Sequence, residues 1–504
     1  TAAATAVLGR WPRFQRGLSL LGGVAYLVAV SALFRAVAAG GPLTYQLSGW
    51  RAPFGITLVA DALAAFMLGL AAVVGIAGLA YAVRTVDAVA QRLAFHPLYH
   101  LLFVGVSGAF LTGDLFNLFV WFEVMLMASY VLVVLYGGPE QTAAALRYVV
   151  LNLVGSAVML VAIGGIYGVT GTLNLADIAR RLANPAAYGI AVAPVLGLSA
   201  LLFAVFALKA GLVPFHAWVP GAYRAAPAPV SAVLAGVVKK VGVYAIVRLY
   251  FTVFAAATLP VSLPGIGGRS ALAFYGPVLL LLAVASIAFG GVAAVDRPDL
   301  DGLLAYSSIS QVGFIALPLA VAATVPAVRA LAVTAALVYA LNHGVAKALL
   351  YLVSGTLQAA VGTDRFDELG GVAARSPVLG SAFFVGALSL VGVPPLVGFF
   401  GKLFVFDALG RAGADLALAA ALVGALLTIG YLSRAWNRAF WGAASPGVAE
   451  ARPAPGLLVI VAGLAALVVL LGVGADPVLR AAEAGATAAL DRTGYVAAVL
   501  GGGP

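Results

Sequence analysis

The sequence of 504 residues contains no cysteine, only four histidines, and 9% charged residues. Without cysteine, disulfides, thiolate metal sites, cysteine-bound iron–sulfur clusters and thiol nucleophiles are excluded. The sequence also lacks a phosphate-cradling loop, a histidine pair at zinc spacing, and a nucleophile with a base nearby. We therefore expect no catalytic residue, no metal site and no cofactor in this chain.

What the sequence has in abundance is apolar residues, which make up 63% of the chain. A helix needs about 20 apolar residues to cross a bilayer, and runs of that length recur along the whole chain. The formal net charge is +10, but the arginines stand singly or in small groups between apolar runs, as membrane-edge anchors do. The composition predicts an all-α, multi-pass protein of the cell membrane, such as the bacterial cytoplasmic membrane, with the lipid bilayer and not nucleic acid around it.

The apolar runs predict thirteen spans, and residues 1–9 resemble the tail of a further helix, which would make about 14 in all. The thirteen are residues 17–39, 55–83, 97–113, 115–137, 144–168, 188–212, 228–250, 272–295, 302–323, 327–357, 377–407, 413–436 and 455–474. Residues 251–268, interrupted by Pro260 and Pro264, are predicted to be interfacial, and 480–499 to form a surface helix.

Two of these spans are interrupted by glycine and proline, near 205–220 at Pro214 and near 388–402 at Pro394 and Pro395. Broken helices at corresponding places of two halves are typical of transporters built from inverted repeats. The chain then divides into N-terminal helices (1–96), a first five-helix repeat (97–250), a second five-helix repeat (272–440), and a C-terminal helix with a surface tail (441–504).

Charged residues inside the spans are few, and they are of an unusual kind. Glu123 is a single carboxylate in an aromatic and aliphatic run, and all five lysines, Lys209, Lys239, Lys240, Lys347 and Lys402, fall inside spans. Each such residue costs roughly 2.5 to 3.5 kcal/mol to insert, on the order of 15 to 20 kcal/mol for the six. Arginine keeps its proton, whereas a buried lysine can release it. The pattern indicates proton or ion movement.

Other polar side chains share helix faces with these groups. Tyr339, His343 and Lys347 are spaced by four, with Asn342 beside them. Lys240 faces the same way as Tyr244, whereas Lys239 lies about 100° round the helix, so we expect only one of the two lysines on a common path. Spacing alone does not choose between them. The candidate polar path also includes side chains able to hold bridging waters, although helix packing would explain them equally: Ser307, Ser308 and Gln311, and more weakly Asn152 and Ser156.

Three further polar residues are expected to act at helix ends. Asp61 stands near the start of its span and is predicted to be an interfacial or helix-start acid, not part of a relay. Asp114 and Asn117 are predicted to cap the helix that carries Glu123.

The motif GDLFNLF at 113–119, continuing to FEV at 122–124, resembles the D subunit of multisubunit Mrp-type sodium/proton antiporters. The segment from 148 to 174 agrees with it. That subunit is similar in turn to the antiporter-like membrane subunits of respiratory complex I, and the resemblance covers about residues 45–440. It implies a fourteen-helix fold of two inverted five-helix units with broken helices.

The resemblance also implies roles for individual residues. Glu123 matches a glutamate that pairs with a lysine on the first broken helix, and Lys209 matches that lysine. Lys240, in KVGVY, matches the next relay lysine, which decides between Lys240 and Lys239. His343 and Lys347 match a connecting pair, and Lys402 matches a terminal lysine. One departure is Asp301–Gly302, where relatives carry basic residues, so a loop contact with a partner subunit there is in doubt.

These observations predict a proton-translocating subunit of a sodium (monovalent cation)/proton antiporter, a secondary transporter subunit and not an enzyme. Its partners would be the other subunits of the complex, protons and Na⁺. A second interpretation is a proton-pumping subunit of a complex I-like quinone oxidoreductase or a membrane-bound hydrogenase. A third is a scaffold subunit whose ionisable residues only hold helices together.

Overall fold

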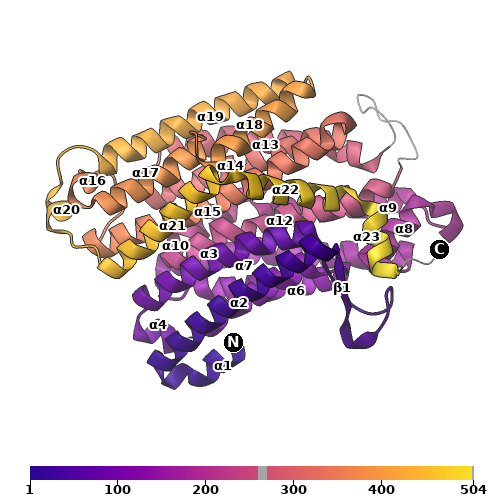
Figure 1. Ribbon diagram of the computed structural model, residues 1–504, viewed down its shortest axis with the longest axis horizontal. Helices are drawn as coiled ribbons and strands as arrows, with labels where there is room; N and C mark the ends of the chain where they lie inside the picture. The colour runs from indigo at the N-terminus through magenta and orange to yellow at the C-terminus, as the bar shows by residue number, and fades with distance from the viewer. Residues whose placement is uncertain (93, 259–269, 502–504) are drawn as a thin grey trace.

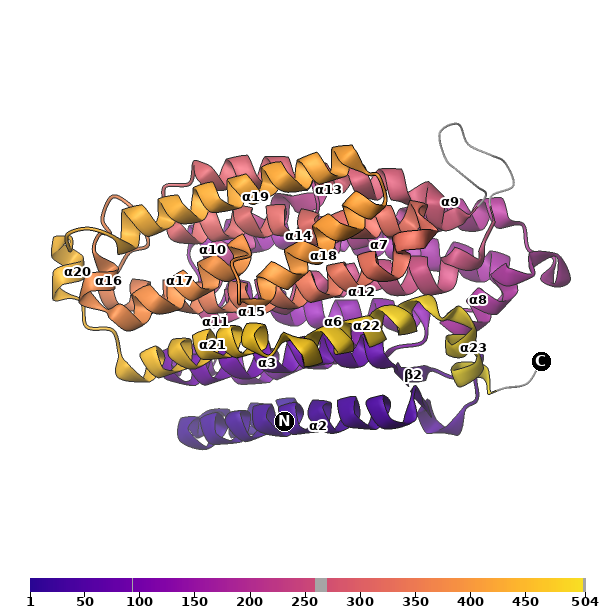
Figure 2. The same ribbon diagram turned by 45° about the horizontal axis from the view of Figure 1, so that its top comes forward.

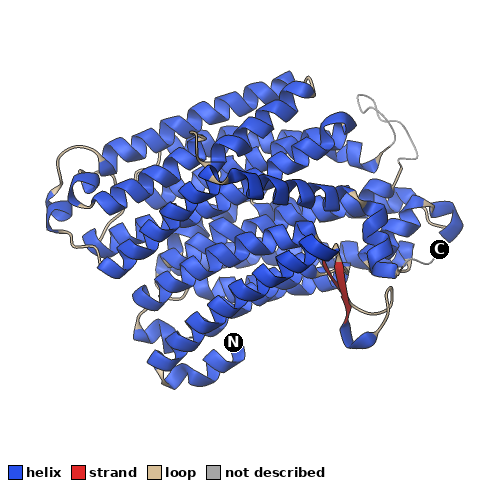
Figure 3. Ribbon diagram, viewed as in Figure 1, coloured by secondary structure: helices blue, strands red, loops and turns tan. Residues whose placement is uncertain are grey.

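A computed structural model describes residues 1–92, 94–258 and 270–501 of the protein, and most of them are helical (Figure 3). The helices run in similar directions and form one elongated bundle (Figure 1). One end of the bundle, the hairpin end, carries β1, β2, α8 and α23. The opposite end, the α20 end, carries α4, α16 and α20.

The elements follow one another along the chain with short connections. The first third holds α1 (Ala2–Val7), α2 (Pro12–Gly40), β1 (Leu43–Gln46), β2 (Thr57–Ala60), α3 (Ala62–Thr85), α4 (Ala88–Arg92), α5 (Phe95–Leu111), α6 (Leu115–Val133) and α7 (Pro139–Thr170). The middle holds α8 (Leu175–Ala183), α9 (Val192–Ala210), α10 (Val219–Ala225), α11 (Ala228–Val233), α12 (Lys239–Ile246), α13 (Ala271–Val295), α14 (Leu300–Thr324) and α15 (Arg329–Val361). The last part holds α16 (Val372–Arg375), α17 (Pro377–Val391), α18 (Val397–Arg411), α19 (Asp415–Ala435), α20 (Pro446–Glu450), α21 (Pro455–Val473), α22 (Ala475–Leu490) and α23 (Arg492–Leu500).

The membrane-spanning character predicted from the apolar runs is confirmed. Among the described residues, 11 helical segments are long and apolar enough to cross a membrane, and α5 and α17 are shorter apolar helices. The prediction for 55–83 is wrong at its start, because residues 57–60 form β2, which pairs antiparallel with β1. The prediction that residues 251–268 form an interfacial segment also differs from the structure. The helix beginning at Ala228 continues to Ala256, and most of the remainder, 259–269, lies outside the described residues.

Both predicted helix breaks are present. α9 ends at Ala210 and the chain resumes helical turns at Phe215, while α17 ends at Val391 and α18 begins at Val397. Gly211 and Gly392 follow the two half-helices with φ of 71° and 91°, a left-handed conformation that glycine adopts without a steric cost. Pro214 and the pair Pro394–Pro395 come next and lack the N–H groups needed to continue a helix.

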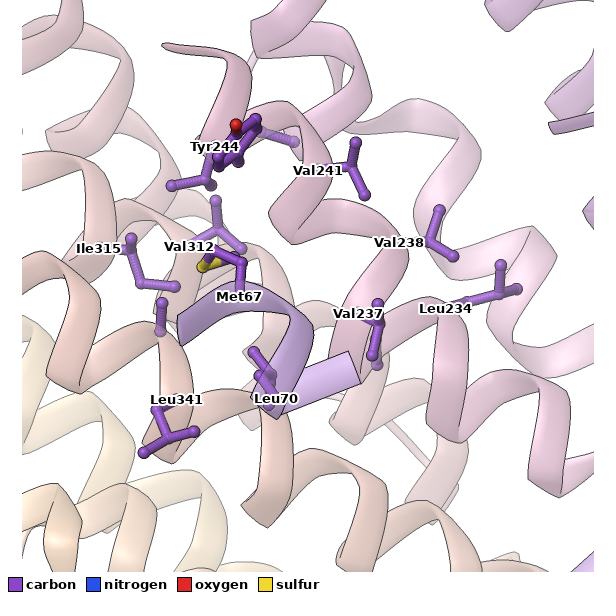
Figure 4. Close-up of a cluster of buried hydrophobic side chains, with 14 of the residues drawn as sticks. Met67, Leu70, Leu234, Val237, Val238, Val241, Tyr244, Val312, Ile315 and Leu341 are labelled. Carbon is purple, nitrogen blue, oxygen red and sulfur yellow. The ribbon is translucent and has the colours of Figure 1, made fainter. Parts of the chain in front are cut away.

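The three most buried spans occupy the centre of the bundle: Ala228–Ala256, Leu300–Thr324 and Pro326–Val361. The first contains two π-helical turns, η5 (Leu234–Val238) and η6 (Val247–Val253), on either side of α12. Side chains from α3 lie among those of the three spans (Figure 4). The labelled residues of this apolar cluster are Met67, Leu70, Leu234, Val237, Val238, Val241, Tyr244, Val312, Ile315 and Leu341. α3 therefore packs its apolar side chains against the place where the three central spans meet.

The C-terminal part forms a strap along the side of the bundle. α21 and α22 follow each other beside α3, and both also contact α15 (Figure 2). The predicted surface helix at 480–499 is thus wrong in two respects: it is two helices, α22 and α23, and α22 runs along the spans. Small residues, Ala482, Gly485, Ala486 and Ala489, form its buried face and allow this close packing. α2 covers the outer side of α3 (Figure 2).

Candidate functional site

Glu123 and Lys209 belong to one polar cluster near the middle of the first broken span. Ser156 on α7 donates a hydrogen bond to Oε1 of Glu123 on α6. Nζ of Lys209 on α9 lies 3.3 Å from Oγ of the same serine and 3.4 Å from the carbonyl oxygen of Asn152. The ammonium also lies 5.9 Å from the centre of the Phe122 ring. The three side chains form a chain in the order Glu123, Ser156, Lys209.

The direct ion pair implied for Glu123 and Lys209 is not formed between these two described residues. α7 packs against both α6 and α9, and its face with Asn152 and Ser156, spaced by four, lies between the charged groups. The serine hydroxyl can accept from the lysine and donate to the carboxylate at once. Ser156 is therefore the bridge of the cluster, a role that the sequence indicated only weakly.

A second cluster lies where the three central spans meet. Nζ of Lys240 lies 2.5 Å from Nδ1 of His343 and 2.5 Å from the carbonyl oxygen of Ala235. Nε2 of His343 lies 3.3 Å from Oγ of Ser308 on α14. All three side chains are fully buried. The structure thus brings together Lys240, His343 and Ser308.

The neighbouring Lys239 also belongs to this cluster, against expectation. Its Nζ lies 3.3 Å from the carbonyl oxygen of Ser308. The two lysines diverge from consecutive positions and reach the same serine–histidine pair from two sides. The expectation that only one of them would lie on the path rested on their angular separation and did not account for a partner placed between them.

Lys347, one turn along α15 from His343, contacts α14 separately. Its ammonium donates to Oγ of Ser307 and, at 2.9 Å, to the carbonyl oxygen of Leu304. Ser307 and Ser308 are adjacent, so α14 presents one hydroxyl to Lys347 and the next to His343. Lys347 and His343 are therefore joined through α14 as well as through their common helix face.

The path beyond His343 continues through Gln311 and Tyr339. The hydroxyl of Tyr339 donates to Oε1 of Gln311. Nε2 of Gln311 donates to Oγ1 of Thr428, at 2.9 Å, and to the hydroxyl of Tyr431, at 2.7 Å. Thr428 and Tyr431 on α19 did not figure in the sequence prediction. The sequence pattern that could have identified them is a pair of polar residues spaced by three in an otherwise apolar span.

Lys402 lies at the second helix break. Its Nζ is 3.0 Å from the carbonyl oxygen of Val391 and 5.0 Å from the centre of the Phe314 ring. Asn342 holds this region together: its Nδ2 lies 3.2 Å from the carbonyl oxygen of Ser389, and the Ser389 hydroxyl donates to its Oδ1 at 2.6 Å. Asn342 thus supports the end of α17, and its side chain is not hydrogen-bonded to a lysine among the described residues.

Tyr244 departs from its predicted place on the path. Its hydroxyl donates to the carbonyl oxygen of Phe110 at 2.7 Å, and Nε of Arg248 lies 3.3 Å from it. Arg248 forms a buried ion pair with Asp61, with Nη2 at 2.6 and 2.7 Å from the carboxylate oxygens. The sequence placed Arg248 at a span end, but the helix continues past it. This pair was missed because its members are 187 residues apart.

The predicted caps are confirmed for the two aspartates. Asp61 accepts from the backbone N–H of Ala64 and Asp114 from that of Asn117, at 2.9 and 2.7 Å, so each caps the following helix. Burial raises the pKa of the Asp114 carboxyl, opposed by its backbone hydrogen bonds. Asn117 instead accepts from Thr112 and from the indole of Trp121, so it is not a backbone cap.

Asp301, where the sequence departs from the family pattern, lies at the α20 end and directs its side chain into the bundle. Its carboxylate accepts from Ser354 at 2.6 Å and from Gln358 at 2.8 Å, both on α15. Its backbone N–H donates to Asp364, and burial raises the pKa of the Asp364 carboxyl. The side chain at 301 is therefore engaged within the chain. Among the described residues, no three histidine or acidic side chains gather as a metal site would require.

Comparison with known proteins identifies the family of this chain. Residues 112–428, which hold every relay candidate, match the family described as NADH:quinone oxidoreductase/Mrp antiporter, transmembrane. The chain belongs to this family. The family resemblance of the motifs at 113–124 is thereby confirmed.

Members of the family with similar sequences come from two kinds of complex. The D subunit of the Na⁺/H⁺ antiporter of Alkalihalophilus pseudofirmus is 38% identical, over 91% of this chain and 89% of its own. The N subunit of the NADH-quinone oxidoreductase of Desulforudis audaxviator is 36% identical, over 88% of this chain and 84% of its own. Among solved structures, a chain of the Mrp complex from Dietzia sp. superposes with a TM-score of 0.89 at 28% identity, covering 99% of this chain and 97% of that one.

Proposed function

We propose that the chain is the proton-translocating subunit of a multisubunit sodium (monovalent cation)/proton antiporter. Its similarity to the D subunit of a Na⁺/H⁺ antiporter, over nine-tenths of both chains, supports this assignment. Its partners would be the remaining subunits of the complex, with protons and Na⁺ as the transported ions. The chain would act as a secondary transporter subunit and not as an enzyme.

The observation that carries the mechanism is a row of ionisable groups across the middle of the spans, of which Glu123 is half-buried and the others are buried. It runs from Glu123 and Lys209 at the first break, through Lys240, His343 and Lys347 at the centre, to Lys402 at the second break. Neutral hydroxyls and amides stand between these groups: Ser156, Ser307, Ser308, Gln311 and Tyr339. In this proposal protons pass along the row.

Coupling in this proposal depends on the first cluster. At an effective dielectric near 20, a carboxylate and an ammonium about 4 Å apart attract by about 4 kcal/mol. Moving Glu123 toward or away from Lys209 would therefore change how firmly the lysine holds its proton. Ser156 can stabilise both the close and the separated arrangement of Glu123 and Lys209, because its hydroxyl can bond to either group alone or to both. Glu123 would tune the relay without carrying the proton itself.

We also propose that residues 97–250 and 272–440 are two five-helix units of inverted topology. Each contains one span broken by a left-handed glycine followed by proline, and each break has a buried lysine within its half-helices. Half-helix ends at mid-membrane are the usual ion sites of inverted-repeat transporters. The two breaks would then serve equivalent half-channels.

The proposal is tested with Glu123→Ala and Lys209→Ala in the intact complex. Both variants should abolish sodium-driven proton movement in inverted vesicles while the complex still assembles. Glu140→Ala, at an exposed glutamate in the first turn of α7, is the matched control and should transport normally. Full activity of both relay variants would refute the proposal. Loss of assembly instead of transport would favour the scaffold function.

A second candidate function is a proton-pumping subunit of a redox complex. The 36% identity to the N subunit of an NADH-quinone oxidoreductase favours it. The two candidates differ in their partners. Flavin- or iron–sulfur-containing proteins purifying with the chain in mild detergent would support the redox complex, and only further membrane subunits would support the antiporter.

A further inference from the structure

Lys239 lies on the side of the second cluster that adjoins the first helix break, and the proposed relay does not use it. The residue is fully buried, and its Nζ lies 3.3 Å from the carbonyl oxygen of Ser308. Its other neighbour is Gly211, directly after α9: a Cβ at that glycine would lie 3.0 Å from Cε and 3.2 Å from Nζ of Lys239. The ammonium therefore touches the first helix break on one side and α14 on the other.

Lys240 does not reach that break. Its Nζ is directed at the carbonyl oxygen of Ala235 and at Nδ1 of His343. Lys209, in turn, directs its Nζ at Asn152 and Ser156, toward α7. Of the two lysines at the junction, Lys239 is thus the one that contacts the segment following Lys209, and both adjoin the Ser308–His343 pair.

Close packing keeps α12 and α9 together at this point. A Cβ at Gly242 would lie 2.6 Å from the backbone nitrogen of Ala210 and 3.0 Å from the carbonyl carbon of Lys209. Only glycine permits this approach. A shift of the C-terminal end of α9 would therefore displace α12 and the side chain of Lys239.

The groups facing Lys239 are basic or neutral. On its own and neighbouring elements these are Lys240 of α12, His343 and Lys347 of α15, His216 before α10, and the ring of Tyr223, whose centre is 6.0 Å from Nζ. Among the described residues, no carboxylate is hydrogen-bonded to Lys239. A fixed ammonium at this place would have no counter-charge, which is costly inside a membrane protein.

We propose that Lys239 is a proton carrier that links the Lys209 end of the relay to His343. The proposal rests on the relay proposed above and adds a second lysine at its centre. The starting state has a neutral Lys240 and a His343 with its proton on Nδ1. The Lys239 ammonium, which lies at the backbone carbonyl of Ser308, then loses one N–H bond by giving a proton to a bridging water. The water gives a proton to the Ser308 hydroxyl, which passes its own to His343, and one N–H bond forms at Nε2. His343 releases its Nδ1 proton to Nζ of Lys240, so one charge has moved one site.

Three substitutions in the intact complex test this role. Lys239→Leu removes the amine, Lys239→Arg keeps the charge but cannot release a proton, and Lys239→His restores a titratable group. We expect at least a tenfold loss of the sodium-driven proton flux for the leucine and arginine variants. The histidine variant should retain flux with its optimum at lower pH, because imidazole titrates near 6.5 and lysine near 10.4.

The outcomes separate a carrier from a structural residue. Wild-type flux in Lys239→Leu, or in Lys239→Arg, would overturn the proposal, since a fixed charge or no charge would then suffice. If the leucine variant fails to assemble, the contrast between arginine and histidine decides. Ser308→Ala should lower the flux, whereas Ser310→Ala, whose hydroxyl bonds to Ile287 on α13, should not.

Failure of this proposal is distinguishable from failure of the relay as a whole. An inactive Lys209→Ala together with an active Lys239→Leu would remove Lys239 from the path and leave the relay in place. Activity in both would refute the relay itself. Native gel analysis of each variant establishes that the complex is intact.

Discussion

Nζ of Lys402 lies 3.0 Å from the carbonyl oxygen of Val391, the last residue of the half-helix α17. The last carbonyls of a helix have no partner within it and carry partial negative charge. The break after Val391 therefore creates an acceptor for an ammonium at mid-membrane. Lys209 differs, because it belongs to the last turn of α9 itself and its ammonium contacts Asn152 and Ser156 on α7.

Lys402→Met should stop transport without preventing assembly. Methionine has a similar length and fills the same space, but it cannot carry a proton or bond to the α17 carbonyl. We expect at least a tenfold loss of sodium-driven proton flux in vesicles. Arg411→Met on the same helix is the control, because its pair with Asp407 is exposed and exposed pairs contribute little to stability. Equal flux in both variants would contradict a role for Lys402.

Ser156→Ala should weaken coupling, because it removes the hydroxyl between Glu123 and Lys209. A hydrogen bond to a charged group contributes about 1.5 to 3 kcal/mol, so roughly a tenfold or greater fall in flux is expected. Ser156→Thr keeps the hydroxyl and should retain most activity. The measurement is the initial rate of sodium-driven proton movement. Equal loss in both variants would point to packing of α7 as the cause.

Gly211→Ala should damage both stability and transport. Its φ of 71° costs an L-residue roughly 1 to 2 kcal/mol, and the new methyl group would press on Lys239. Gly164→Ala is the control, since a Cβ at that helical glycine meets nothing within 4 Å. It should be neutral or stabilising by about 1 kcal/mol. Thermal unfolding of the purified complex and vesicle flux measure the two effects, and normal flux in Gly211→Ala would contradict the expectation.

Breaking the Asp61–Arg248 pair should be strongly destabilising. Asp61→Asn or Arg248→Met alone leaves a buried charge without its partner, which costs about 3 to 5 kcal/mol. The double variant should recover part of this loss, because neither charge remains. A denaturation series on the four proteins gives the coupling free energy. Additive losses would show that the two residues do not act as a pair.

The sequence predicted those features that depend on local composition. Apolar length indicated the spans, glycine and proline marked the breaks, and spacing by four aligned His343 with Lys347. The contacts between distant segments could not be predicted in this way. The Asp61–Arg248 pair, the bridging by Ser156, and the approach of Lys239 to Ser308 depend on how helices far apart in sequence pack. The β2 strand was missed because only Asp61 separates its apolar residues from the apolar residues of α3.

The C-terminal strap also depends on contacts between segments far apart in sequence, which the sequence alone did not predict. The sequence of α22 combines small residues with three charged ones, Asp476, Arg480 and Glu483, and is typical of a helix at the membrane surface. Its small residues instead pack against α3 and α15, a partner surface that composition does not reveal. Tyr495 on α23 then lies with its ring 4.8 Å from the guanidinium of Arg248.

In the proposed relay the ionisable groups lie inside the spans of neighbouring helices, so protons would pass across the bundle and not along it. A membrane voltage acts on charge that moves between the two faces, at about 2.3 kcal/mol per elementary charge per 100 mV. Protons travelling sideways from Lys209 to Lys402 would do almost no work against that field. The voltage dependence of transport should therefore arise in the vertical steps that load and unload the row at the two helix breaks.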